Sequence, residues 1–430
     1  MLSLIILILL YIVIPVVLIW LTMKFAILKK LGSVVLAYIL GIIIANIGIL
    51  PKGSDTFLRE TVGKDRGYIP KTEVAAMYSA GILTEKDINA NNVATIQDSV
   101  QSALIPLALP LILFSLSVRR WLKFSGKGFL SMILAMISVS IIVATGYLIF
   151  GEKIPEGNKV AGMLIGTYTG GSINMAALAV ALKVQPHTFI MTNTYDMIVG
   201  GLTILFFITI GPTVFRSILP PYKNHSKQNN GDIDYKSMEK EMAEEFDDYS
   251  GMFKKGTLLP LLGALGLAIL IFAAGFGVSL LIPKVQLLIS VILTITTLGV
   301  AASFIPKVRQ IKKSFQLGMY FITAFSFVIA SRCDLSVFFQ VKYVNILFFV
   351  TYAYFGSLLL HLLLSWIFRV DADNYLITTT GFVYSPPFVP MVAAALKNKD
   401  VILTGLATGI IGWIIGNYIG IAFSIWLGKI

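Results

Sequence analysis

Charged residues are scarce in this 430-residue chain. Asp, Glu, Lys and Arg together make up 13% of it, against about 25% in ordinary soluble domains. Hydrophobic residues make up 57% and gather in long uncharged runs. Runs of this length suit the hydrocarbon core of a bilayer, where the backbone must satisfy its own hydrogen bonds. The composition therefore predicts an all-α integral membrane protein.

Cysteine and histidine are also rare. Cys333 is the only cysteine, which excludes an internal disulfide framework and a cysteine-based metal site. The three histidines, His187, His225 and His361, lie far apart and lack the spacing of metal ligands. No Gly-Lys-Ser/Thr follows a glycine-rich loop, so the sequence lacks the ATP-binding motif that ATP-driven transport would need. We expect no enzyme activity and no cofactor, apart from Na⁺ as a candidate coupling ion.

The net charge of +12 does not indicate a nucleic-acid partner, because basic residues of membrane proteins collect in loops on one side of the bilayer. The lipid bilayer is the expected partner. The first apolar run is too long for a signal peptide and lacks a charged start, so we expect it to be a transmembrane helix.

The apolar runs form two sets of six. They lie at 3–23, 34–50, 102–118, 129–150, 160–182 and 187–212, then at 257–282, 285–305, 316–331, 343–367, 374–396 and 401–428. These sets predict a first membrane repeat at 1–215, with a polar loop at 51–101, and a second at 257–430. Residues 216–256 form a polar cytoplasmic linker between them.

The run at 160–182 is interrupted by the motif Gly166-Thr-Tyr-Thr-Gly-Gly-Ser-Ile-Asn-Met175. Two adjacent glycines weaken a helix, and four polar side chains stand where a membrane helix usually carries Leu or Val. Irregular backbone is tolerated at membrane depth only when it is buried in protein or lines a cavity. The motif predicts a broken element that holds a ligand. Close packing of helices through small residues is the alternative.

The interruption occurs twice. Ala179, Ala181, Leu182 and Lys183 recur 214 residues later as Ala393, Ala395, Leu396 and Lys397, and Gln101 recurs 215 residues later as Gln316. Thr378-Thr-Thr-Gly-Phe-Val-Tyr-Ser-Pro-Pro387 then corresponds to the glycine motif. If each interrupted run is a re-entrant hairpin, most of the 34 basic residues lie on the cytoplasmic side of the membrane, as is usual for membrane proteins. Each half then has about five full spans, and the repeats are inverted. Unwound crossing helices remain open as an alternative.

A broken element exposes N–H groups that attract an anion, and carbonyl groups that, with hydroxyls, suit Na⁺. The expected substrate-binding residues are Gly170, Gly171, Ser172, Asn174, Thr380, Tyr384 and Ser385. The expected ion-coupling residues are Thr167, Thr169, Asn193, Thr194, Asp196 and Thr379.

Asp196 is the sharpest single candidate, because it lies in an otherwise neutral run and a carboxylate in a bilayer costs a few kcal/mol. It is expected to bind Na⁺ with Asn193 and Thr194, or to carry a proton. A structural hydrogen bond is the alternative. His361, on an apolar helix, is interpreted as a buried histidine whose hydrogen bonds are satisfied.

Several motifs together resemble the membrane proteins of domain-of-unknown-function family 819. They are the glycine motif, the following Ala177-Leu-Ala-Val-Ala-Leu182, Thr192-Asn-Thr-Tyr-Asp196, Pro106–Phe114 with Arg119-Arg120, and Gly409–Gly416. The resemblance implies a transporter-like protein. More distantly, the chain is similar to glutamate–sodium and citrate–sodium symporters, which use paired re-entrant hairpins with glycine pairs. It departs from them at Ser385-Pro-Pro387, where a glycine pair would stand.

Together these features predict a secondary active transporter of the bacterial inner membrane, coupled to Na⁺ or H⁺. The expected substrate is a small organic anion, an amino acid or a short peptide. A sodium–proton antiporter is the alternative, and a receptor or scaffold without transport is the alternative from another class. Related folds imply a homodimer through the first two spans of each half.

Overall fold

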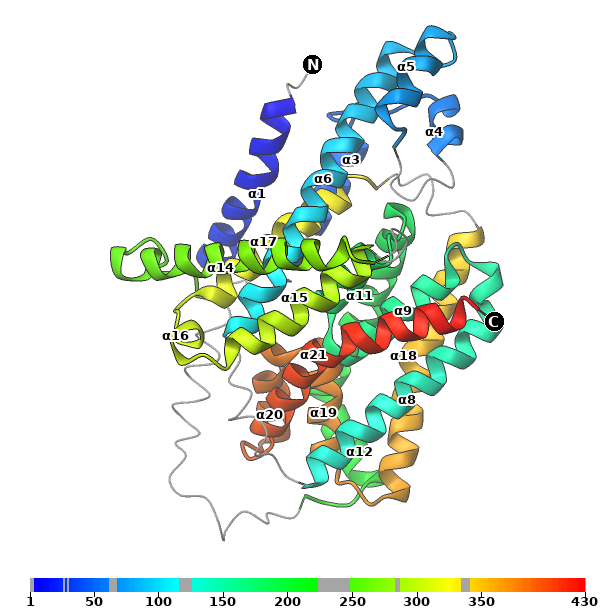
Figure 1. Ribbon diagram of the computed structural model, residues 1–430. Coiled ribbons are helices and arrows are strands. Elements are labelled where there is room, and N and C mark those ends of the chain that lie inside the picture. Colours follow the sequence, from blue (N-terminus) through cyan, green and yellow to red (C-terminus); the bar gives the residue numbers. More distant parts are fainter. Residues whose placement is uncertain are drawn as a thin grey trace.

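The computed structural model describes residues 4–25, 28, 31–61, 68–115, 126–222, 248–282, 287–333 and 341–429. Within these ranges the regular structure is helical and contains no strand (Figure 1). Seven of the described helices are long and apolar enough to cross a membrane, and shorter apolar helices accompany them. The predicted all-α, multi-pass membrane protein is confirmed.

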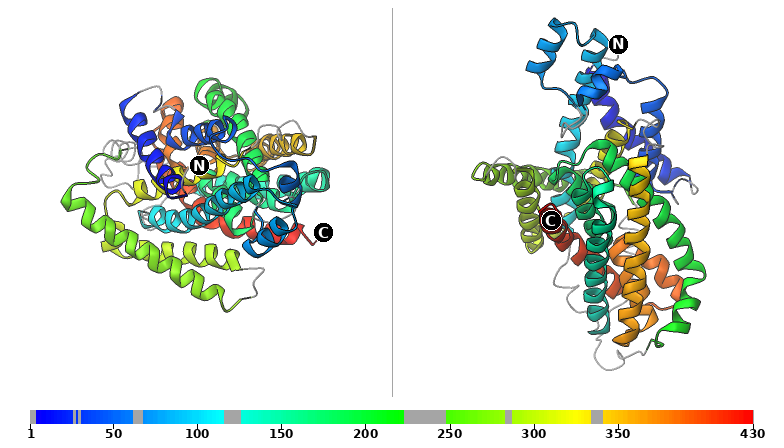
Figure 2. Two further views of the ribbon diagram at one scale, coloured as in Figure 1. Left: turned by 90° about the horizontal axis from the view of Figure 1, so that it is seen from above. Right: turned by 90° about the vertical axis from the view of Figure 1, so that its right-hand side faces the viewer.

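Six helices pack mainly on one another and are called the frame: α1 (Leu4–Lys24), α3 (Ser33–Asn46), α6 (Glu85–Phe114), α14 (Lys255–Ser279), α15 (Leu287–Ser303) and α17 (Ser314–Ala330). Eight others form the hairpin unit: α8 (Gly126–Phe150), α9 (Gly157–Gly170), α10 (Ser172–Ala181), α11 (Pro186–Thr209), α18 (Val341–Ile367), α19 (Ala372–Tyr384), α20 (Val389–Leu396) and α21 (Ile402–Leu427). Figure 2 shows α14 beside α15 on one flank and α8 beside α18 on another.

Corresponding helices of the two halves run antiparallel. Ser314, the first residue of α17, donates to the carbonyl of Leu111 near the end of α6 at 2.6 Å. Gln97, earlier in α6, donates to Ser331 just beyond the end of α17 at 2.9 Å. Helices α8 and α18 are related in the same way, because Lys127 at the start of α8 donates to the carbonyl of Arg369 after α18 at 2.9 Å.

The polar stretch 51–101 is more ordered than a loop. It contains α4 (Asp55–Thr61), α5 (Lys71–Ser79) and the first half of α6, which therefore starts well before the predicted run. Thr84 begins α6 with a capping box, in which its hydroxyl accepts from the Asp87 backbone N–H while the Asp87 carboxylate accepts from the Thr84 N–H. The cap makes a polar helix start stable outside the apolar run.

Only the ends of the predicted linker 216–256 are described. Helix α12 (Gly211–Ile218) enters it, and residues 223–247, including most of its charged part, lie outside the described ranges. At the far end the Asp248 carboxylate binds the Lys313 ammonium at 2.8 Å. This ion pair fixes the end of the linker to the short loop that follows α16 (Pro306–Arg309).

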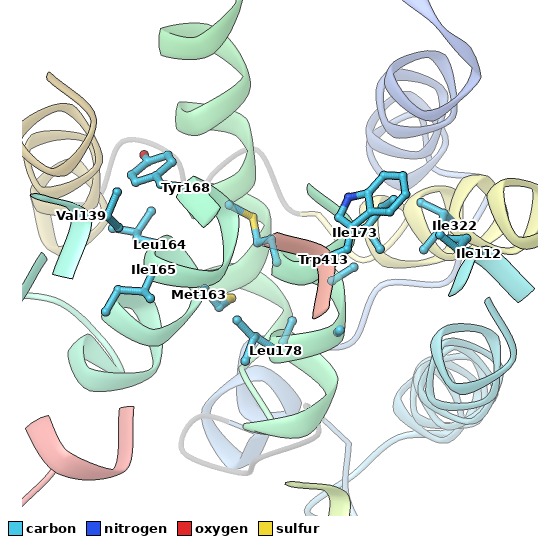
Figure 3. Packing of buried hydrophobic residues seen from close by; sticks show 14 of the residues in the cluster. Ile112, Val139, Met163, Leu164, Ile165, Tyr168, Ile173, Leu178, Ile322 and Trp413 are labelled. Carbon is cyan, nitrogen blue, oxygen red and sulfur yellow. The ribbon is translucent and has the colours of Figure 1, made fainter. Parts of the chain in front are cut away.

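The centre of the hairpin unit is a close contact between α9 and α21. Gly162, Gly166 and Gly170 lie opposite Gly420, Gly416 and Gly412 in an antiparallel crossing. A Cβ atom added at Gly412 would lie 1.6 Å from the Thr169 carbonyl oxygen. Small residues allow such close approach of membrane helices. Apolar side chains of α9 and α10, including Leu164, Tyr168 and Leu178, belong to the buried core of this unit (Figure 3).

We predict that Gly412→Leu destabilises the protein by more than the roughly 1–3 kcal/mol typical of overpacking, because backbone blocks the added side chain. The matched control is Gly263→Leu on α14, where an added Cβ meets nothing within 4 Å. The measurement is the apparent Tm of the purified protein in detergent. Equal Tm values for the two variants would contradict the close crossing.

The Asp248–Lys313 pair predicts a pH dependence. The Lys313 ammonium lowers the pKa of Asp248 from 3.8 to about 2. A depressed carboxyl pKa adds stability above the unfolded-state pKa, and that stability is lost as the pH falls through the folded-state value. The Asp248 side chain is 40% exposed, so the contribution is at most about 1 kcal/mol. The Tm gap between wild type and Asp248→Asn should narrow as the pH falls from 4 toward 2, and a constant gap would contradict it.

Candidate functional site

The glycine motif turns the chain back on itself. Helix α9 ends at Gly170, Gly171 takes a positive φ of 73°, and α10 returns antiparallel to α9. Such a backbone conformation favours glycine. The two ends of this hairpin are tied together, because the Lys159 ammonium donates to the Lys183 carbonyl at 3.0 Å. The chain therefore enters and leaves hairpin 1 (α9, Gly171 and α10) at one end.

The second motif forms a corresponding hairpin 2, which consists of α19, Ser385, the 3₁₀ turn η5 (Pro386–Phe388) and α20. Ser385 has a φ of 74°, a strained value for a residue with a side chain. At the base, the Asp373 carboxylate accepts from the Asn398 amide at 2.8 Å and from the Arg216 guanidinium at 2.9 Å. Arg216 also donates to the Leu396 carbonyl at 2.7 Å. These bonds close hairpin 2 at its own base.

The tips of the hairpins meet. The Ser385 hydroxyl donates to the Gly170 carbonyl at 3.1 Å, and a Cβ atom on Gly171 would lie 2.0 Å from the Ser385 oxygen. Gly171 and Ser385 are 214 residues apart, the offset of the repeated motifs. Along α21, hairpin 1 covers the part from Gly412 to Ser424, and hairpin 2 covers the part from Gly405 to Trp413. The hairpins thus approach each other from opposite ends of one spanning helix.

The tip of hairpin 1 carries two polar side chains with different environments. The Asn174 amide nitrogen donates to the Gly412 carbonyl at 2.9 Å, while its Oδ1 is buried without a partner among the described residues. Ser172 is the only exposed residue between Val160 and Leu182. The tip therefore presents one buried hydrogen-bond acceptor, Oδ1 of Asn174, and one exposed hydroxyl, that of Ser172.

The predicted threonines are buried and bonded to their own helices. Thr167, Thr169, Thr379 and Thr380 each donate to the carbonyl four residues earlier, at 2.7–2.9 Å. Bonding of this kind satisfies the hydroxyl proton and leaves the oxygen lone pairs free to accept. Such oxygens suit a cation. The described residues contain no group of three or more His, Cys, Asp or Glu that could hold a metal ion.

Asp196 is buried and faces a cluster of tyrosines. Its carboxyl group interacts electrostatically with three tyrosine hydroxyls. They belong to Tyr168 of α9, Tyr354 of α18 and Tyr384 at the end of α19. The hydroxyls of Tyr354 and Tyr384 hydrogen-bond to each other, and Tyr384 donates to the Gly200 carbonyl at 2.9 Å. The cluster brings α9, α11, α18 and α19 to one acid. Sequence reasoning missed Tyr168 and Tyr354, although Tyr168 lies inside the glycine motif.

Within the predicted group of Asp196, Asn193 and Thr194, the threonine points away from the acid. Thr194 donates to the hydroxyl of Tyr38 on α3 at 3.4 Å. Residues two positions apart lie on opposite sides of a helix, so Thr194 points to the frame while Asp196 points into the hairpin unit. Asn193 lies between them and donates to the Met197 sulfur at 3.3 Å.

The family described as "Protein of unknown function (DUF819)" matches residues 72–430. The chain belongs to the DUF819 family. It is similar to the "Uncharacterized membrane protein YjcL" of Bacillus subtilis (strain 168), with 25% identity over 341 residues that cover 78% of this chain and 84% of the relative. The resemblance drawn from the motifs is confirmed. One of them, Arg119-Arg120, lies outside the described residues.

We predict that Ser385→Ala and Ser385→Gly both weaken the contact between the tips of this DUF819 protein. Ala keeps the strained φ of 74° without the hydroxyl, whereas Gly relieves the strain. Losing a buried hydrogen bond costs about 1–3 kcal/mol, so Ala should lower the apparent Tm more than Gly. If neither variant differs from wild type, the tip contact contributes nothing to stability.

Proposed function

We propose that this protein is a secondary active transporter built from two inverted repeats, each with a re-entrant hairpin. The carrying observation is the contact between Ser385 and Gly170, where the two hairpin tips meet after approaching from opposite ends of α21. The antiparallel packing of α6 with α17 and of α8 with α18 supports the inversion. Transporters with inverted repeats bind substrate at such breaks near the midplane.

The chemistry of the tips favours a small organic anion, an amino acid or a short peptide as substrate. The start of α10 presents free backbone N–H groups beside the exposed Ser172, which suits a carboxylate. In the proposal Gly170, Gly171, Ser172 and Asn174 contact the substrate from hairpin 1. Thr380, Tyr384 and Ser385 contact it from hairpin 2. Coupling uses Na⁺ or H⁺ at Asp196 and the nearby threonines.

The second arms of the two hairpins, α10 and α20, are buried by the rest of the protein to different extents. This difference supports alternating access. Helix α10 is buried and packs on α6 and α15 of the frame. Its counterpart α20 exposes Met391, and Phe388 at the end of η5 is exposed as well, each 41% accessible. An equivalent pair of elements in two environments is expected when a transporter is closed on one side and open on the other. In the proposal, this conformation is open on the side of hairpin 2.

A sodium–proton antiporter is the second candidate, and the isolation of Asp196 favours it. Among the described residues of α11, Asp196 is the only acid, and three tyrosines rather than basic residues surround it. A buried carboxyl in such surroundings can exchange a proton for a cation. For either candidate we propose a homodimer in the bacterial inner (cytoplasmic) membrane. The similarity to a bacterial membrane protein supports the membrane location.

The test is cation-specific stabilisation. We expect Na⁺ to raise the apparent Tm relative to K⁺ and choline at equal ionic strength, and Asp196→Asn to abolish the rise. A ligand that binds only the folded state adds RT ln(1 + [L]/Kd), about 2.7 kcal/mol at a hundredfold excess over Kd. The matched control is Glu152→Gln, an exposed acid in the 3₁₀ turn that follows α8.

A rise that persists in Asp196→Asn would remove Asp196 from the sodium site. No difference between cations in wild type would argue against sodium coupling, and pH would then replace Na⁺ as the variable. Candidate anions, amino acids and peptides are screened in the stabilising cation, where substrate and ion should stabilise the protein cooperatively.

A further inference from the structure

A small cavity, called the base cavity, lies between the frame and the base of hairpin 1. It has a volume of about 30 Å³, and its walls expose polar as well as apolar surface. Asp98, Gln101 and Ser102 of α6 line it from the frame, and Lys183, just after α10, lines it from the hairpin unit. Helix α10 has 10 residues, a rise of about 15 Å, so the cavity lies one helix length away from Ser172 at the tip.

The polar groups of the base cavity that have no partner can donate hydrogen bonds. Among the described residues, neither the Lys183 ammonium nor the Ser102 hydroxyl makes a hydrogen bond or an ion pair. The Gln101 amide nitrogen makes one long contact, 3.4 Å to the Asp98 carboxylate. An ammonium can only donate, and a hydroxyl can donate as well as accept. The cavity therefore suits a ligand that accepts hydrogen bonds.

The acid on the cavity wall is already compensated by a buried cation. The Arg332 guanidinium lies 3.8 Å from the Asp98 carboxylate and donates to the Gln101 side-chain oxygen at 3.3 Å. The Asp98 and Arg332 side chains are only 9% and 6% exposed, so each depends on the other for charge balance. Once these two charges are balanced, the charge of Lys183 is left without a counterpart, and an anionic ligand would supply it.

The acid at the base of hairpin 1 is engaged with other groups. The Glu156 carboxylate accepts from the Lys159 ammonium at 2.7 Å and from the Gln185 N–H at 2.8 Å. The Lys159 ammonium also donates to the Lys183 carbonyl at 3.0 Å. Glu156 and Lys159 thus balance each other, and the side chain of Lys183 takes no part in this pair.

The backbone around the base cavity also favours an anion. Helix α11 begins at Pro186, which lines the cavity, and has no acidic residue in its first turn. The N–H groups at a helix start attract anions. At the end of α10, the Ala179 carbonyl is already paired, because it accepts from the Val184 N–H at 2.9 Å.

We propose that the base cavity binds a small soluble carboxylate, which joins the Lys183 ammonium of the hairpin unit to the Ser102 hydroxyl of the frame. A cavity needs about 10–15 Å³ to hold one water, so the volume of about 30 Å³ accommodates the two oxygens of a carboxylate group. Phe189, Phe325 and Leu288 supply an apolar wall for the attached carbon chain. The site goes beyond the proposed function, because it lies apart from the hairpin tips.

A carboxylate in this place holds hairpin 1 against the frame. Helix α10 packs on α6 and α15, and the base cavity lies between these elements and the turn after α10. Any separation of the hairpin unit from the frame would move Lys183 away from Ser102. A ligand shifts a conformational equilibrium toward the form that it binds more tightly. The anion therefore favours the arrangement in which α10 is covered.

The test measures how a carboxylate protects the base cavity from chemical modification. Leu288, partly exposed on the cavity wall, is replaced in a Leu288→Cys/Cys333→Ala variant, which has no other cysteine. Its alkylation by iodoacetamide is followed in lipid-free detergent, in choline acetate and in choline chloride at equal ionic strength. We expect acetate at about ten times its Kd to slow alkylation about tenfold, because only the unoccupied fraction reacts. Acetamide, which is neutral, should not slow it.

Lys183→Gln in the same background should abolish the protection, because it removes the unbalanced charge and breaks no hydrogen bond of the fold. The matched control is Lys397→Gln, which should keep the protection. Lys397 follows α20, lies 214 residues after Lys183 and has a similar positive φ, 53° against 51°, but its side chain is exposed and does not line the cavity.

Equal protection in Lys183→Gln, or equal protection by acetate and chloride, would overturn the carboxylate site. Protection by phosphatidylserine and not by acetate would overturn it in favour of a lipid headgroup. If the Leu288→Cys variant does not fold, the rise in Tm with acetate is compared between wild type and Lys183→Gln, and an equal rise would overturn the site. Sodium-specific stabilisation without acetate protection would refute this site alone. Acetate protection without a sodium effect would refute sodium coupling and keep the site.

Discussion

The contact between the hairpin tips is the interaction on which the rest of the structure depends. Ser385 donates to the Gly170 carbonyl, and no side chain fits at Gly171 because the Ser385 oxygen occupies that space. Both tips lie against α21, where the backbone of α9 comes so close that only glycine fits at Gly412. Two broken elements in an apolar interior are acceptable because each one covers the other.

The polar side chains near the tips follow the same constraint. Threonines that bond their own helix, and an asparagine that donates to the Gly412 carbonyl, leave few unpaired donors in an apolar interior. What remains unpaired is mostly oxygen: Oδ1 of Asn174 and the Tyr168 hydroxyl. A site rich in acceptors and supported by an acid is suited to a cation or a proton, and backbone N–H groups at the tips are left for an anionic partner.

Charged residues at the hairpin bases join the two arms of each hairpin. Asp373 with Arg216 and Asn398 closes the base of hairpin 2. At the base of hairpin 1, the Glu156 carboxylate accepts from the Gln185 N–H and the Lys159 ammonium donates to the Lys183 carbonyl. Both hairpins are therefore closed at their bases. Their second arms differ in what covers them: α10 packs on α6 and α15 of the frame, whereas α20 packs on α11 and α21.

The sequence by itself determined the membrane class, the positions of the two interruptions and the family, because these depend on composition and on short motifs. It also singled out Asp196 and Ser385, since a carboxylate in an apolar run and a proline pair beside a serine are local signals. Only the tertiary structure decided that the interruptions fold back as hairpins, and that Asp196 faces Tyr168 and Tyr354 while Thr194 faces the frame. Those facts depend on how helices far apart in the chain pack, and a pattern read along one segment contains no information about the neighbours of that segment in space.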